Sequence, residues 1–189
     1  MKIAVFGGSF DPIHRGHLAV ADAVQDRLRP DLLLWVPARA APHKPGRCPA
    51  PAADRAALIE AVLAGRPGER LCRLELEREP PSYTVDTLEE LARLHPGAEF
   101  LLVLGGDSQE HWPNWRRRER ILELATPVWF PRPGWERLRP GVPGRMLAME
   151  LVPISSSRIR AALARGEDCS RWLPPAVAAE IAARGLYRA

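Results

Sequence analysis

The sequence predicts an α/β fold built on a doubly wound parallel sheet. Short apolar runs alternate with segments in which apolar residues recur at helical spacing, and this alternation is typical of parallel βαβ units. The chain has 189 residues, of which 46% are hydrophobic, enough for one packed core. No internal repeat, low-complexity tract or linker interrupts the pattern. We therefore expect a single domain over residues 1–189.

The order of predicted elements follows from the apolar patterns and their stop signals. Strands are expected where apolar runs end at turn residues, over residues 2–6, 31–37, 70–77, 99–106, 127–134 (its first part) and 146–153. Helices are expected over residues 17–28, 54–64, 82–94 (capped by Ser82 or Thr84), 115–125, 155–164 and 175–184. Ligands bind beyond the carboxyl ends of such strands, so the loops that follow the strands are the expected place for a site. These loops cover residues 7–17, 37–47, 78–86, 105–115, 131–135 and 153–160. The second of them belongs to a longer loop over 38–53 that is rich in Pro, Ala and Arg.

Composition narrows the function classes. The formal net charge is +4, and the basic side chains are almost all Arg, since Lys2 and Lys44 are the only lysines. Arginine suits phosphate recognition, and a basic surface also suits nucleic acid. A GC-rich genome, whose codons favour arginine, would produce the same excess of arginine over lysine. The three cysteines form no CxxC pair, so neither a zinc site nor a disulfide framework is expected.

Targeting signals are not expected in this chain. No apolar run approaches the roughly 18–20 residues that span a bilayer, and the first residues do not fit a signal peptide. We therefore expect a soluble, cytoplasmic protein.

The loop GGSFDPIHRGH (7–17) is the first candidate for chemistry. It is neither a Walker loop nor a dinucleotide fingerprint. Gly7 and Gly8 would permit backbone geometry barred to other residues and close approach by a ligand. His14 and His17 would share one side of a helix start, where Gly16 adds no bulk, and could donate N–H bonds to phosphoryl oxygens. The alternatives are two histidines that merely cap or pack, or a metal pair, for which no third ligand is evident.

A second candidate is ISSSRIR (154–160). Serine hydroxyls and main-chain amides at a helix start, with Arg160 one turn in, can cradle a triphosphate. The alternative interpretation is an ordinary cluster of N-capping serines.

These two motifs carry a resemblance to a known superfamily. GGSFDPIHRGH resembles the HxGH signature of the adenylyl- and cytidylyltransferases, and ISSSRIR is similar to their second signature. The resemblance implies the Rossmann-like nucleotidyltransferase fold. The middle of the chain resembles the bacterial nicotinate-mononucleotide adenylyltransferase family in PHK (42–44), SYTVDTL (82–88), LGGDS (104–108), Trp115 and RPG (132–134). The likeness runs in order from Lys2 to Arg160.

The resemblance implies a reaction as well as a fold. ATP and nicotinate mononucleotide would give deamido-NAD and pyrophosphate, a step of NAD biosynthesis. Mg²⁺ would travel with ATP rather than in a protein metal site, and the helices from about residue 155 would close the ATP site. The expected partners are the two substrates, with no nucleic acid and no membrane; a homo-oligomer is compatible with the sequence.

The resemblance also assigns roles to individual residues. The catalytic set would be His14, His17, Lys44 and Arg160, with His17 donating to the α-phosphate and His14 to the α/β region. ATP would be bound by Gly7, Gly8, Ser9, Phe10, His17, Gly105, Asp107, Ser155, Ser156, Ser157 and Arg160, with Asp107 on the adenosine ribose. Nicotinate mononucleotide would be bound by His14, Lys44, Ser82, Tyr83, Thr84, Trp115 and Arg132, with main-chain N–H groups near Thr84 on its carboxylate.

Several alternatives stay open at this point. Ser9 and Ser157 stand where the family more often has Thr, which keeps the hydroxyl. Trp112 lies one turn from Trp115, so either could stack on the pyridine ring or belong to the core. The run RRRER (116–120) is either a solvated helix face or a contact with substrate or a partner. The acceptor could instead be nicotinamide mononucleotide or phosphopantetheine, the donor a cytidine nucleotide, or the chain a basic nucleotide- or RNA-binding module.

Overall fold

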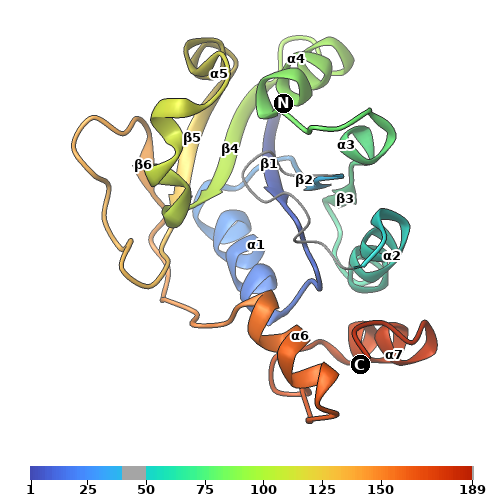
Figure 1. Ribbon diagram of the computed structural model, residues 1–189. Coiled ribbons are helices and arrows are strands. Elements are labelled where there is room, and N and C mark those ends of the chain that lie inside the picture. Colours follow the sequence, from blue (N-terminus) through green and yellow to red (C-terminus); the bar gives the residue numbers. More distant parts are fainter. Residues whose placement is uncertain (40–49, 189) are drawn as a thin grey trace.

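A computed structural model describes residues 1–39 and 50–188. Its six strands form one parallel sheet in the order β3-β2-β1-β4-β5-β6 (Figure 1). The strand order reverses between β1 and β4, as in a doubly wound sheet, which confirms the predicted fold class. The strands are β1 (Lys2–Gly8), β2 (Leu32–Pro37), β3 (Glu69–Leu71), β4 (Glu99–Gly105), β5 (Ala125–Phe130) and β6 (Arg145–Met146).

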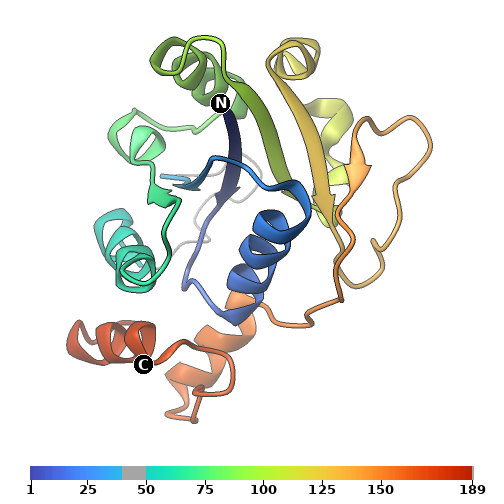
Figure 2. The same ribbon diagram turned by 180° about the vertical axis from the view of Figure 1, so that it is seen from behind.

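Helices cover both faces of the sheet (Figures 1 and 2). They are α1 (Arg15–Leu28), α2 (Ala52–Leu63), α3 (Leu74–Glu77), α4 (Thr84–Leu94), α5 (Arg118–Leu124), α6 (Ser156–Ala164) and α7 (Pro175–Ala183), with 3₁₀ turns η1 (Gly106–Glu110) and η2 (Trp112–Asn114). In the part of the chain that the structure describes, no helix is long and apolar enough to cross a membrane.

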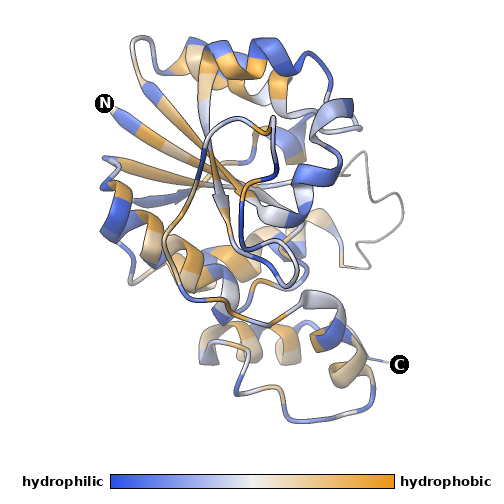
Figure 3. Cartoon of the chain, turned by 90° about the vertical axis from the view of Figure 1, so that its left-hand side faces the viewer, coloured by the Kyte–Doolittle hydropathy of each residue, from blue (hydrophilic) through white to orange (hydrophobic). Residues whose placement is uncertain are grey.

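Two hydrophobic clusters, one on each face, hold the layers together. In β1, Ala4 and Phe6 join the cluster that contains residues of α1, α2, α6 and α7. The intervening Ile3 and Val5 join the cluster formed with α4 and α5. The central strands are thus buried on both faces, which explains their continuous apolar sequence; Figure 3 shows hydrophobic colour along the strands and on the helices beside them.

The predicted strand over 70–77 is wrong beyond its first residues. The pairing of β3 with β2 ends at Leu71 opposite Trp35, and residues 74–77 form the short helix α3. Leu74 packs against the cluster that includes α4, while Glu75 is buried and accepts a hydrogen bond from Thr87 (2.8 Å). The alternating apolar and acidic residues 74–77 therefore form one helical turn at the edge of the sheet.

The predicted strand over 146–153 is also mostly wrong, because β6 pairs with β5 over only two residues. Leu147 still donates its N–H to the Trp129 carbonyl (2.7 Å), but no regular structure follows until α6. The helix expected from residue 115 begins at Arg118, because the 3₁₀ turn η2 and a left-handed Arg117 (φ 50°) precede it.

The predicted capping of α4 by Ser82 or Thr84 is wrong. Tyr83 is the N-cap residue and makes no side-chain capping bond. The Ser82 hydroxyl accepts the Arg39 N–H instead (3.2 Å). The side chain of the N-cap residue therefore does not bond to the first main-chain N–H groups of α4.

Candidate functional site

A cavity of about 790 Å³ opens at the carboxyl ends of the central strands, where the strand order reverses. This is the place at which open α/β sheets bind ligands. Predicted site residues on its wall are Gly7, Gly8, Ser9, Phe10, His17, Ser82, Tyr83, Thr84, Gly105, Asp107, Trp115 and Arg132. His14, Ser155, Ser156, Ser157 and Arg160 are not on this wall, and Lys44 lies outside the described residues.

The glycines at the end of β1 act differently from the prediction. Neither Gly7 nor Gly8 has a positive φ; the left-handed residue of this loop is Phe10 (φ 48°). A Cβ at Gly8 would stand 3.0 Å from the Phe10 ring, whereas a Cβ at Gly7 would meet nothing within 4 Å. Gly8 is therefore needed for packing, and Gly7 leaves open space at the cavity.

The two histidines of the loop meet as the spacing predicts. α1 begins at Arg15 with His14 as its N-cap residue, and the rings of His14 and His17 stack with centroids 3.8 Å apart. The His14 main-chain N–H donates to Nδ1 of His17 (3.2 Å). A neutral His17 ring therefore carries its proton on Nε2, and His17 is the member of the pair that lines the cavity.

His14 is only 1% exposed. Burial and then the nearby charge of Arg132 lower its pKa to about 3, so the ring is neutral at pH 7. Within the described residues its Nδ1 is buried without a hydrogen-bond partner. A Cβ at Gly16 would lie 3.0 Å from two atoms of the ring, so the glycine gives the imidazole its place, as predicted.

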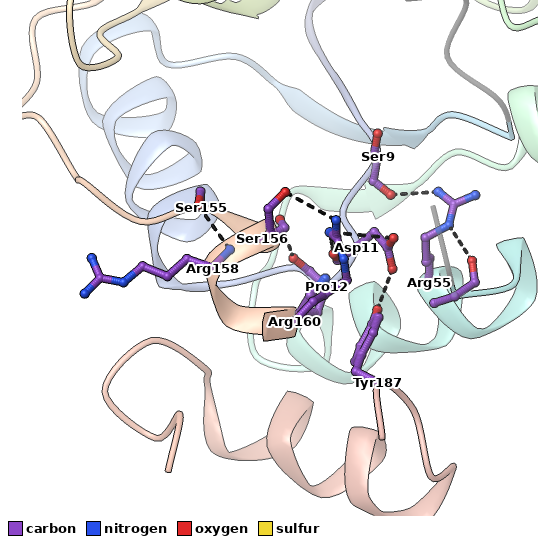
Figure 4. A network of polar contacts seen from close by, with 11 residues as sticks. Ser9, Asp11, Pro12, Arg55, Ser155, Ser156, Arg158, Arg160 and Tyr187 are labelled. Carbon is purple, nitrogen blue, oxygen red and sulfur yellow. Dashed lines mark hydrogen bonds and ion pairs between the residues drawn. The ribbon is translucent and has the colours of Figure 1, made fainter. Parts of the chain in front are cut away.

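The second motif lies directly against the first. Ser155 caps α6 by accepting the Arg158 N–H (3.3 Å), and the Ser156 hydroxyl donates to the Pro12 carbonyl (3.1 Å) across 144 residues of sequence. Arg160 donates to the Asp11 carbonyl (Figure 4). It also donates to the Ser157 hydroxyl. The Ser156 hydroxyl and the Arg160 guanidinium thus hold the two loops together, and phosphate binding here stays a prediction.

The N-terminus of α4 faces the same cavity through Ser82, Tyr83 and Thr84. The first amides of a helix have no partner within the helix and favour an anion. Trp115 also lines the cavity, whereas Trp112 is 4% exposed and packs edge-on against Trp129. Of the two tryptophans, Trp115 is therefore the one placed to stack on a ligand.

Beyond β4 and β5 lie Asp107 and Arg132. Asp107 is exposed at the cavity. Burial lowers the pKa of Arg132, and the charge of Asp107 opposes that shift. Arg132 donates to the Ile154 carbonyl (3.4 Å) and lies over the Phe130 ring. The structure thus groups Arg132, assigned above to the mononucleotide, with residues assigned to ATP.

The cavity wall also includes polar residues outside the predicted set, among them Glu75, Thr87, Asn114 and Arg116. Glu75 lies in the run that resembled a strand, and burial raises the pKa of its carboxyl group. Arg116 lies in the run 116–120, and its guanidinium sits 4.7 Å from the Tyr83 ring centroid. Arg117 and Arg120 of that run instead pair with Glu89 of α4.

Among residues 1–39 and 50–188, no group of three or more His, Cys, Asp and Glu side chains could hold a metal ion. Mg²⁺ carried by the oxygens of ATP would require no such group, so its participation stays a prediction.

Several known proteins are similar to this chain. The model of the cytidylyltransferase-like family matches residues 5–162. A probable nicotinate-nucleotide adenylyltransferase of Thermus thermophilus is 42% identical over 188 residues, covering the whole of both chains. A protein of the same name from Geobacillus thermodenitrificans is 39% identical over all of this chain and 87% of its own length.

The chain belongs to the nicotinate-nucleotide adenylyltransferase family. In fold it is also similar to the nicotinic acid mononucleotide adenylyltransferase of Plasmodium falciparum complexed with NaAD, with a TM-score of 0.78 and 22% identity over 98% of this chain and 97% of the other. The superfamily resemblance drawn from the two motifs and the family resemblance drawn from the middle of the chain are both confirmed.

Proposed function

We propose that this chain transfers AMP from ATP to nicotinate mononucleotide, giving deamido-NAD and pyrophosphate. One observation carries the proposal: a single cavity is lined both by the HxGH histidine and Asp107, the ATP set, and by the α4 N-terminus and Trp115, the acceptor set. Two ligands bound side by side in one cavity can react directly. The names of the full-length relatives support the same reaction.

The nucleophile in this proposal is the 5′-phosphate of the mononucleotide. That phosphate is already an anion at pH 7, so it can attack the α-phosphorus of ATP in line without a general base. Catalysis then consists of positioning and of neutralising charge on the phosphoryl oxygens. His17, with its proton on Nε2, donates to the α-phosphate. Arg160 and the start of α6 steady the β- and γ-phosphates that leave.

Preference for the nicotinate base would come from α4. A carboxylate gains more than a neutral carboxamide from the amides and dipole of a helix N-terminus. Tyr83, Thr84 and Trp115 all lie on the cavity wall, so a pyridine ring stacked on the tryptophan would direct its carboxylate to the amides at the start of α4.

Mg²⁺ belongs to the proposal as part of the ATP substrate. It would neutralise phosphate charge while bound to phosphate oxygens and water. The same proposal includes a cytoplasmic location and no nucleic-acid substrate. Whether the chain forms a homo-oligomer can be measured by light scattering.

The experiment is a pyrophosphate-release assay with MgATP and one acceptor at a time. Nicotinate mononucleotide should give rapid release and a dinucleotide of the mass of deamido-NAD. Nicotinamide mononucleotide should react at least tenfold less efficiently in kcat/KM, and phosphopantetheine not at all. Equal use of both pyridine nucleotides would contradict the role given to α4. Release with none of the three would refute the reaction.

A further inference from the structure

Asp11 is a buried carboxylate of the HxGH loop that the proposed reaction does not use. It is 1% exposed. Its Oδ1 accepts a hydrogen bond of 2.6 Å from the hydroxyl of Tyr187, a residue that follows the last helix, α7 (Figure 4). Its Oδ2 has no hydrogen-bond partner among the described residues and lies 3.8 Å from Nη1 of Arg160. Three distant parts of the chain thus meet at one carboxyl group.

Arg160 is held in place by the same loop. Its Nη1 donates to the Asp11 carbonyl (2.6 Å), and its Nη2 donates to the Ser157 hydroxyl (3.2 Å). Its side chain remains 22% exposed, so the guanidinium can still meet an anion from outside. The position of Asp11 therefore sets the position of Arg160.

Tyr187 adopts a backbone conformation that requires support. Its φ is 61°, in the left-handed region that non-glycine residues seldom adopt. Such strain persists where surrounding contacts compensate for it. Burial and the bond to Asp11 raise the pKa of Tyr187, so the hydroxyl keeps its proton and remains a donor to the carboxylate.

We propose that Tyr187 is a positioning residue, which acts through Asp11 to orient the Arg160 guanidinium toward the polyphosphate of ATP. The C-terminal segment after α7 is then part of the phosphate site without touching substrate. The inference rests on the proposed function in one respect, that Arg160 meets phosphate.

The test variant is Tyr187→Phe, which removes the hydroxyl and leaves Oδ1 of Asp11 without this donor. The KM for ATP should rise about tenfold, while the KM for nicotinate mononucleotide stays unchanged. The Kd of inorganic pyrophosphate, measured by calorimetry with no acceptor present, should rise by a similar factor. Equal rises of both KM values, or a loss of thermal stability with unchanged pyrophosphate affinity, would overturn the proposal.

Arg184→Gln is the matched control. Arg184 ties α7 to Asp54 of α2 and to Glu180 within its own helix, away from Asp11. The variant should loosen the C-terminal helix and leave the pyrophosphate Kd unchanged; a rise equal to that of Tyr187→Phe would show that any loosening suffices, and the proposal would fall.

A second variant covers the case in which Tyr187→Phe does not fold. Asp11→Asn keeps the size of the side chain and removes its charge beside Arg160, and it should also weaken pyrophosphate binding; unchanged binding would overturn the proposal. Pyrophosphate binding needs no acceptor, so it can be measured whatever the reaction is. If the variants bind pyrophosphate more weakly but the wild type forms no deamido-NAD, the proposed function is refuted and this inference stands.

Discussion

At the scale of single residues, two imidazoles one helical turn apart have different environments. His17 lines the cavity and has its Nδ1 occupied by a main-chain N–H. Burial, and then the charge of Arg132, lower the pKa of His14 to about 3. The spacing predicted that the two rings meet, but only the folded chain could separate a ring at the surface of the cavity from a neutral ring in the interior.

Replacing His17 by Ala should lower kcat by about 10²–10³, because one preorganised donor to a phosphoryl oxygen is lost. Steady-state kinetics with MgATP and nicotinate mononucleotide measure this. His95→Ala is the control, since His95 lies at the end of α4 and not on the cavity wall, and its kcat should stay near the normal value. A near-normal kcat for His17→Ala would remove His17 from the mechanism.

His14 should make the fold sensitive to acid. Its folded pKa of about 3 lies below the ordinary histidine value of 6.5, so the unfolded chain takes up a proton that the folded chain refuses. The contribution to stability is complete above pH 6.5 and is lost as the pH falls towards 3. Compared with His14→Asn, the wild type should lose about 2–3 kcal/mol of unfolding free energy between about pH 7 and 4.5.

Urea titrations of both proteins at the two pH values measure this difference. The comparison cancels the carboxyl groups that the two proteins share, Asp11 among them. A difference between wild type and variant that does not change with pH would show that His14 takes up its proton as readily in the folded protein as in the unfolded chain.

At the scale of elements, the central strands were predictable because they are buried on both faces. A continuous apolar run such as residues 100–104, bounded by a charge and a glycine pair, indicates a strand that is covered on both sides. The edges were not predictable: at β3 and β6 the length of a strand depends on how far its neighbour extends, which local sequence does not encode. The helices α1 and α6 were predictable to within two residues, α1 because apolar residues recur at helical spacing before Pro30, and α6 because a run of serines with Ser155 marks its start.

The start of α4 offers a test of one main-chain donor. Thr84 is the first residue of the helix, after an extended Tyr83, so proline fits there without distortion and removes one main-chain N–H along with the threonine side chain. Thr84→Pro should lower kcat/KM for nicotinate mononucleotide about tenfold or more, because hydrogen bonds to charged groups contribute about 1.5–3 kcal/mol. The ratio of nicotinate to nicotinamide use should fall with it.

Thr84→Ala is the matched control, since it keeps the N–H and removes the side chain. It should retain the preference for the nicotinate substrate. If both variants lose the preference equally, the hydroxyl rather than the main chain would be responsible, and the assigned role of the α4 amides would be wrong.

At the scale of the whole molecule, the site depends on contacts that join distant sequence segments. Ser156 reaches Pro12 across 144 residues and Tyr187 reaches Asp11 across 176. Motif recognition could predict that the HxGH loop and ISSSRIR meet, because phosphate binding is expected of both. It could not predict Tyr187 or Glu75, since no local pattern distinguishes a tyrosine after the last helix or a glutamate in an alternating run.

The same long-range contacts predict that residues 1–189 unfold as one unit, with no separate melting of α6 and α7. Ile181 of α7 is 4% exposed and belongs to the hydrophobic cluster that contains Phe6 of β1 and Val24 of α1. Ile181→Ala should cost about 2–5 kcal/mol. Native-state hydrogen exchange should then show reduced protection by that amount in β1 and β4 as well as in α7. Leu122→Ala, at an exposed position of α5, should leave the protection of these elements nearly unchanged.

The contradicting outcome is that Ile181→Ala lowers protection in α7 alone while β1 and β4 keep theirs. The C-terminal helices would then be a separate folding unit. Their expected closing of the ATP site would be a docking equilibrium rather than a fixed part of the fold.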